Sequence, residues 1–153
     1  MERRKFLGIG LTSALLLPLG VLATDFRKTK PVTWTAKSVN DAIKALYGDV
    51  TLKESKEISL KIPKMTSNGM SVPVGIKSKI KAKTVALFQN SNPESAVSVW
   101  TVPENGIVDY NLKIKLKTIE NEASVVTLVV EGEDGEFYVT HTSVMVLGES
   151  CEG

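Results

Sequence analysis

The residue with the greatest chemical reactivity in this chain lies near its C-terminus. Cys151 is the only cysteine among 153 residues, and it stands in the stretch GESCEG, formed by Gly148, Glu149, Ser150, Cys151, Glu152 and Gly153. A free cysteine usually packs in a core as a small apolar side chain, but no apolar residue surrounds this one. Because a thiolate is a nucleophile that can hold a group covalently, we predict an accessible thiol on a flexible C-terminal arm, residues 148–153.

The other residues that could do chemistry do not form a catalytic set. His141 is the only histidine, and one histidine with one cysteine does not make a zinc or copper site. Its spacing in an apolar segment favours a half-buried structural role. The acidic residues near position 134 fit a solvated turn, and neither a phosphate-binding glycine loop nor a nucleophilic serine motif is present. We therefore predict no catalytic residue, no metal site and no cofactor.

The N-terminus has the pattern of an export signal. Arg3-Arg4 and Phe6-Leu7 precede an apolar or small-residue segment that reaches Leu22, and Val21-Leu22-Ala23 fits a signal-peptidase site. The paired arginines are typical of the twin-arginine signals that export folded proteins. The alternative is an uncleaved anchor, but the glycines and Pro18 in this segment make a poor membrane span. We expect residues 1–23 to be removed after Ala23, giving a periplasmic protein with no stable membrane insertion.

The predicted cleavage changes the charge of the chain. The whole sequence has 19 basic and 17 acidic residues, and residues 1–23 contain three of the basic ones and one acidic one. The mature part then holds 16 of each, so its formal charge of zero gives no reason to expect a nucleic-acid partner. An exported protein normally pairs its cysteines in disulfides, and an odd one indicates an intermolecular bond or a reactive thiol.

One helix is predicted before a series of strands. Residues 38–48 combine a capping serine, an apolar stripe and a terminal glycine, as helices do. Residues 24–37 form an N-terminal segment, and residues 38–147 form one domain. Alternating or continuous apolar runs then predict seven strands, with a hairpin turn at Asp134-Gly135. The strands are predicted at residues 58–62, 72–80, 84–89, 96–102, 108–116, 125–131 and 136–147. We predict an all-β fold, an immunoglobulin-like antiparallel β-sandwich with one N-terminal helix.

Four stretches precede the C-terminal cysteine: ISLKIP at 58–63, NGMSVPVGI at 68–76, VALFQNSNP at 85–93 and GEFYV at 135–139. Together with that cysteine, they resemble the SoxY family, the sulfur carriers of the periplasmic thiosulfate-oxidising Sox system. The resemblance implies an immunoglobulin-like sandwich that is a covalent carrier and not an enzyme. It also implies that Cys151 is the sulfur attachment residue.

The resemblance further implies the partners. A SoxZ-like subunit would form a heterodimer with this chain. A haem-containing thiosulfate-coupling enzyme, a sulfate-releasing hydrolase and in some systems a sulfane dehydrogenase would act on the carried sulfur. The family's arm ends in a Gly-Gly-Cys-Gly-Gly type sequence, whereas Ser150 and Glu152 flank the cysteine here.

Two other classes of function stay open at this stage. The chain could be an exported β-sandwich binding module that docks a partner through a sheet edge, with Cys151 incidental. It could also be a thiol-redox enzyme, although no second cysteine or basic neighbour stands beside Cys151.

Overall fold

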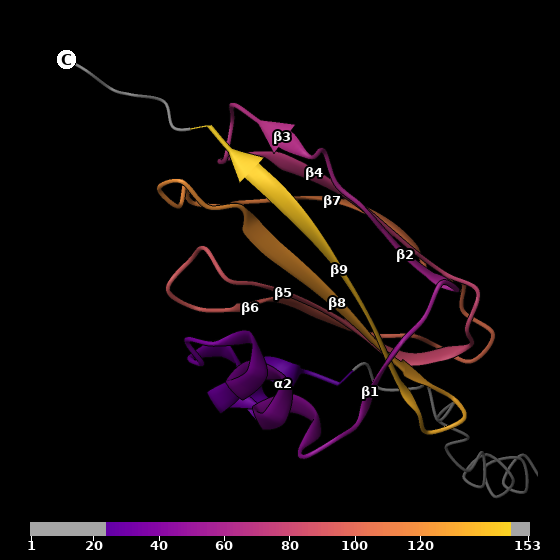
Figure 1. The fold of residues 1–153 in the computed structure, drawn as a ribbon. Coiled ribbons are helices and arrows are strands. Elements are labelled where there is room, and N and C mark those ends of the chain that lie inside the picture. Colours follow the sequence, from indigo (N-terminus) through magenta and orange to yellow (C-terminus); the bar gives the residue numbers. More distant parts are fainter. Residues whose placement is uncertain (1–23, 148–153) are drawn as a thin grey trace, which may run out of the picture.

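Two β-sheets packed face to face make up most of the molecule. The computed structural model describes residues 24–147, and Figure 1 shows the two layers, with α2 on the outer side of the larger one. The larger sheet has the order β1-β9-β8-β5-β6, and β3 pairs with the C-terminal end of β9, whereas β1 pairs with its start. The smaller sheet has the order β2-β4-β7. The strands of the larger sheet are β1 (Leu52–Glu54), β3 (Met65–Thr66), β5 (Ala82–Gln89), β6 (Ala96–Thr101), β8 (Ser124–Gly132) and β9 (Phe137–Val146). Those of the smaller sheet are β2 (Ile58–Lys61), β4 (Val72–Ser78) and β7 (Asp109–Ile114).

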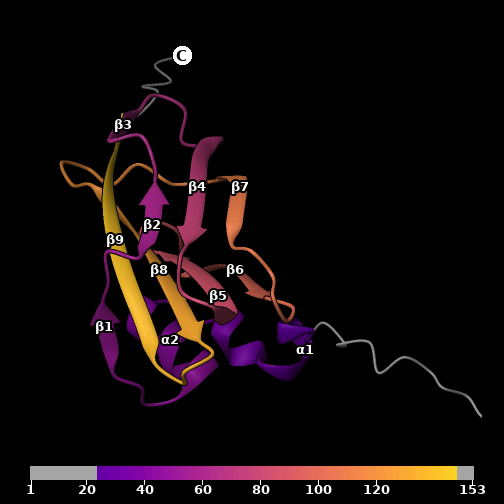
Figure 2. The ribbon, with the colours of Figure 1, turned by 90° about the vertical axis from the view of Figure 1, so that its right-hand side faces the viewer.

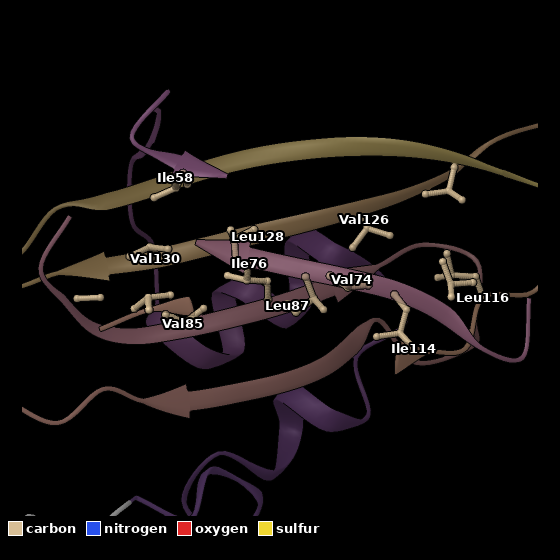
Figure 3. Close-up of a cluster of buried hydrophobic side chains, with 14 of the residues drawn as sticks. Ile58, Val74, Ile76, Val85, Leu87, Ile114, Leu116, Val126, Leu128 and Val130 are labelled. Atoms are coloured by element: carbon tan, nitrogen blue, oxygen red, sulfur yellow. The ribbon is translucent and has the colours of Figure 1, made fainter. Parts of the chain in front are cut away.

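The smaller sheet is buried on one face only, which its sequence pattern reflects. In β4, Val72, Val74 and Ile76 are buried, while Pro73 and Lys77, on the opposite face of the strand, are exposed. Successive side chains of a strand point to opposite faces, so this alternation places the apolar set against the larger sheet. Figure 3 shows the resulting core between the sheets, with side chains from both layers meeting.

The larger sheet is buried on both faces. The four residues from Val85 to Phe88 are all fully buried, and every residue from Val126 to Val130 is buried as well. Val85 and Leu87 face the core between the sheets, whereas Ala86 and Phe88 belong to a second apolar cluster on the outer side. A strand covered on both faces needs no polar alternation, and this explains the continuous apolar runs in the sequence.

The second cluster is closed by helix α2 (Val39–Tyr47). Ser38 caps the helix, because its Oγ accepts a hydrogen bond from the Asp41 amide at 3.1 Å. Gly48 ends it with a φ of +83°, a left-handed conformation that glycine adopts without strain. Two short turns, α1 (Phe26–Thr29) and η1 (Pro31–Trp34), precede it. The apolar face of α2, with Ala42, Ile43 and Leu46, packs on the outer face of the larger sheet.

The predicted fold and the predicted helix are confirmed, and all seven predicted strands are present with ends shifted by a few residues. Two strands were not predicted, β1 and β3. Both lie along the outer edge of β9 and run parallel to it, whereas β8 pairs with β9 in antiparallel fashion. The predicted turn at Asp134-Gly135 joins β8 to β9, with Gly135 at a φ of +82°.

Strand β9 spans the length of the sheet and connects its two ends. It is paired with β8 from Phe137 to Val144, with β1 at its start and with β3 at its end. Figures 1 and 2 show that β9 ends beside β3, at the opposite end of the strand from the β8–β9 turn. Among residues 24–147, no helix is long and apolar enough to cross a membrane.

Candidate functional site

The described part of the candidate site is the base from which the predicted arm begins. The six predicted arm residues lie outside the described residues, as do residues 1–23 of the predicted signal. They are Gly148, Glu149, Ser150, Cys151, Glu152 and Gly153. The base itself consists of the end of β9, strand β3 and the loop that follows β3.

Backbone hydrogen bonds fix the chain up to Leu147. The Met145 amide donates to the Lys64 carbonyl at 2.9 Å, and the Leu147 amide donates to the Thr66 carbonyl at 2.8 Å. The two-residue strand β3 therefore holds the end of β9 and the residue after it in place by backbone hydrogen bonds. Cys151 follows four residues later, so its Cα lies within ~13 Å of that of Leu147 even for a fully extended chain.

The loop after β3 packs closely on the end of β9. The Gly69 carbonyl accepts a hydrogen bond from the Leu116 amide at 2.8 Å. A Cβ atom at position 69 would overlap the Leu116 carbonyl and press on the Val146 side chain. Asn68 also fixes Met70, because the Asn68 side-chain oxygen accepts a hydrogen bond from the Met70 amide at 3.0 Å. Glycine is thus required at position 69 for this close approach.

Three large apolar side chains stand exposed around this base. Met65, Met70 and Leu147 are 60%, 67% and 46% exposed. A hollow of about 390 Å³ lies between the loop after β3, the end of β9 and the segment that follows β7, and Met70, Lys117 and Leu147 are part of its lining. Sequence analysis did not single out these three residues. The sequence does hold one indication of them: Met65 and Met70 are the two large apolar residues in the otherwise polar or glycine stretch 64–71.

A larger open groove lies where β2 leaves β4 to cross toward β9. Its volume is about 950 Å³, and its lining is mainly apolar, with Leu60, Ile62 and Leu112, together with Lys61 and Lys113. No carboxylate, imidazole or thiol belongs to that lining. The groove therefore offers apolar contact area together with lysine ammonium groups.

His141 lies far from the base of the arm, and its predicted burial is wrong. Its side chain is exposed, and its Nδ1 lies 3.0 Å from the Thr127 hydroxyl. On the same face of β9, Phe137 and Val139 are covered by the second apolar cluster, but this cover ends before position 141. His141 precedes Leu147 by six residues of extended chain, about 20 Å. An extended arm would take Cys151 only ~13 Å from Leu147, so the thiol does not reach His141.

Two acidic residues at the β8–β9 turn, Asp134 and Glu136, have partners among neighbouring residues, and Asp134 is exposed, as predicted for a solvated turn. Asp134 accepts hydrogen bonds from the Tyr138 hydroxyl at 2.7 Å and from the Glu136 amide at 3.0 Å. The Tyr138 hydroxyl is the main cause that lowers the pKa of Asp134. Glu136 forms an ion pair with Lys53 at 2.8 Å. This turn lies at the opposite end of β9 from the arm.

One other ionisable group is strongly perturbed. Tyr47 is the last residue of α2, and burial of its side chain raises the pKa of its hydroxyl. That hydroxyl is 2.8 Å from the Thr84 hydroxyl, which in turn donates to Glu131 at 2.9 Å. The chain of bonds joins the helix to the sheet and gives Tyr47 a structural role. Within residues 24–147, no group of three or more potential metal ligands comes together.

Comparisons with known proteins agree with this geometry. The family model described as "Sulfur oxidation protein SoxY" matches residues 43–151. No curated protein matches the chain. Among solved structures, the sulfur carrier protein SoxY from Chlorobium limicola f thiosulfatophilum is 26% identical, with a TM-score of 0.62 over 74% of this chain and 95% of that chain.

A second similar structure shows the fold alone. A superoxide reductase (neelaredoxin) from Ignicoccus hospitalis is 12% identical, with a TM-score of 0.50 over 59% of this chain and 80% of that chain. At that identity the likeness extends to the β-sandwich and not to its chemistry. The family match, by contrast, covers well over half of the chain and reaches position 151, and on this ground the chain belongs to the SoxY family.

Proposed function

We propose that this chain is a sulfur carrier of thiosulfate oxidation that holds sulfur intermediates covalently on Cys151. One observation carries the proposal: the family match runs from residue 43 to residue 151 and so includes the only cysteine. The similar solved structure is titled as a sulfur carrier protein, which supports the same role. The base of the arm adds a physical argument, since the chain is anchored up to Leu147 and the thiol follows four residues later.

Loading forms one sulfur–sulfur bond. The Cys151 thiolate and the outer sulfur of thiosulfate together lose two electrons, which a haem-containing partner enzyme accepts, and the product is a cysteine S-thiosulfonate. A hydrolase then adds water to the terminal sulfonate and releases sulfate with two protons, leaving a persulfide on Cys151. In some systems a sulfane dehydrogenase is a further partner, which takes up six electrons while the remaining sulfur gains three oxygen atoms from water and six protons are released. The carrier supplies the thiol and its position, and the partner enzymes supply the catalysis.

The residues beside the thiol set this arm apart from a glycine-only arm. Glu149 and Glu152 place negative charge next to Cys151, which disfavours the thiolate and repels the thiosulfate dianion. Ser150 adds a side chain where glycine would leave the backbone free. We propose that loading of this arm is slower than loading of a glycine-only arm and depends more on a partner enzyme that neutralises the two carboxylates.

The assembly and location belong to the same proposal. The twin-arginine pattern of residues 1–23 supports export to the periplasm, and family membership supports a SoxZ-like subunit as the heterodimer partner. Export of the folded pair would carry along a partner that has no signal of its own. Co-expression followed by sedimentation tests this part, and two separate monomers would contradict it.

The carrier role is tested by substituting the thiol. Cys151→Ser should abolish the gain of sulfur mass from thiosulfate, measured by intact-mass spectrometry after incubation of the complex with its haem-containing partner. The melting temperature should stay unchanged, since a residue beyond the anchored end of β9 contributes little to the core. Ser150→Ala is the matched control, because it alters the neighbouring residue and keeps the thiol.

The result separates the carrier from the alternative. Sulfur mass that still appears on Cys151→Ser would show that the thiol is not the attachment residue. Wild-type protein that gains no mass with an active partner enzyme would favour the exported binding module with an incidental cysteine.

A further inference from the structure

We infer that the exposed apolar surface around the base of the arm is a docking surface for the enzymes that act on Cys151. Its members are Met65, Met70 and Leu147, which we call the arm-base patch. The inference rests on the proposed function, because it names the surface by which that function's partner enzymes are bound. The occupant is the rim of an active-site opening that admits the thiol.

The reach of the arm determines where an enzyme must make contact. Leu147 is hydrogen-bonded to Thr66 and so belongs to the fixed sandwich. Cys151 follows four residues later, which limits its distance from Leu147 to ~13 Å. Any active site that receives the thiol must bring its opening within that distance of Leu147. An enzyme with a recessed active site therefore lies against the surface around Leu147 during the reaction.

That surface is where exposed apolar side chains gather. Five large apolar residues are exposed among residues 24–147, and three of them form the arm-base patch. The other two, Val32 and Ile107, lie in η1 and in the connection between β6 and β7. Met65 is next to the end of β9 through its pairing with Met145, and Met70 and Leu147 line the same hollow. Clustered exposed apolar surface marks a site of protein interaction more often than single exposed residues do.

The residue types fit a surface that several partners use in turn. Methionine is unbranched and polarisable, so it adapts to differently shaped surfaces, and interfaces that bind many partners use it often. Below these side chains the backbone is fixed, with Gly69 packed against Val146 and Leu116. The patch thus combines adaptable side chains with a rigid support.

Charge beside the patch indicates the chemistry of the occupant. Lys117 lines the same hollow as Met70 and Leu147, and Lys64 precedes Met65; both are exposed. Neither lysine is among the ion pairs found between described residues. An opening with an apolar rim and acidic residues outside it would complement this arrangement.

Enzymatic loading of a double variant tests the inference. The full-length chain, in complex with its partner subunit, is loaded with thiosulfate by the haem-containing coupling enzyme of the same organism. Met65→Ser with Met70→Ser should lower kcat/KM for the carrier about tenfold, through a higher KM, because interface contacts are lost and the thiol is not. Reaction of Cys151 with iodoacetamide, which needs no docking, should keep its rate.

Matched variants make the test specific. Val32→Ser with Ile107→Ser removes two exposed apolar side chains elsewhere, 65% and 83% exposed, and should leave kcat/KM unchanged. Met65→Leu with Met70→Leu keeps the apolar surface and should retain most of the loading rate. Since both methionines are exposed, all variants should melt within a few degrees of the wild type.

Three outcomes are possible, and each decides a different point. A tenfold loss confined to the arm-base serine variant supports the docking surface. Equal loading of wild type and that variant overturns the docking surface and leaves the carrier function intact. A wild-type chain that is alkylated by iodoacetamide but is not loaded by the active enzyme overturns the carrier function, and the inference with it.

Discussion

The two ends of strand β9 are completed in opposite ways. At its start, the Phe137 ring packs at a tilt against Tyr47 of α2 with ring centroids 4.9 Å apart, and Val139 is buried in the same cluster. At its end, a two-residue strand holds the backbone, while Met65 and Leu147 remain exposed. Within residues 24–147, the first end is covered by helix α2, and no helix covers the second. The contrast separates a part of the molecule that maintains the fold from a part that is available to other proteins.

The largest expected effect comes from removing the cover at the first end. Leu46 of α2 is buried against the sheet, and Leu46→Ala should lower the free energy of unfolding by about 2–5 kcal/mol, because it leaves a cavity between helix and sheet. Met70→Ala at the other end should change it by less than about 0.5 kcal/mol. Urea denaturation measures both, and similar losses for the two variants would contradict the comparison.

A smaller effect is expected at the helix cap. Ser38→Ala removes the acceptor of the Asp41 amide hydrogen bond and should cost about 1 kcal/mol of stability. Thermal or chemical denaturation measures the loss. Thr118→Ala, at an exposed position outside the helices and strands, is a suitable control and should show almost none. If Ser38→Ala is as stable as this control, the cap does not contribute to the stability of helix α2 on the sheet.

The smallest effect concerns the turn that begins β9. The Tyr138 hydroxyl lowers the pKa of Asp134, so Tyr138→Phe should raise that pKa toward its ordinary value of 3.8. A carboxylate whose folded-state pKa is lowered adds stability above its unfolded-state pKa and loses it as pH falls through the folded-state pKa. The variant should therefore lose less stability than the wild type on acidification below about pH 4.

Titration of the Asp134 carboxyl by NMR measures this shift directly. Tyr110→Phe is the control, since Tyr110 packs against Trp100 and is not among the groups that shift the pKa of Asp134. An Asp134 pKa that is the same in wild type and Tyr138→Phe would show that the hydrogen bond does not cause the shift.

The sequence predicts the strands that carry a pattern of their own, and not those that depend on a neighbour. The alternation in Val72–Ser78 predicts β4 because one face of that strand is buried. The strands β1 and β3 are three and two residues long, too short to display a period, and both exist because β9 offers them an edge. Position 141 illustrates the same limit. Its parity on the strand was readable, but whether a helix reaches over it depends on tertiary structure.

The candidate site divides in the same way. The lone thiol and its polar surroundings are visible in the sequence, since they depend on composition alone. The arm-base patch is not, because Met65, Met70 and Leu147 are separated along the chain and meet only through the pairing of β3 with β9 and the packing of the loop at Gly69.

The anchoring of Leu147 also has a consequence for how strongly a carrier needs to bind. A thiol tethered within about 13 Å of a fixed point is presented to a docked active site at an effective concentration in the millimolar range or above. The reaction of the arm is then effectively intramolecular, and the docking contact itself can be weak. Weak contact permits rapid dissociation, so one carrier can pass its cargo through several enzymes in succession without being retained by any of them.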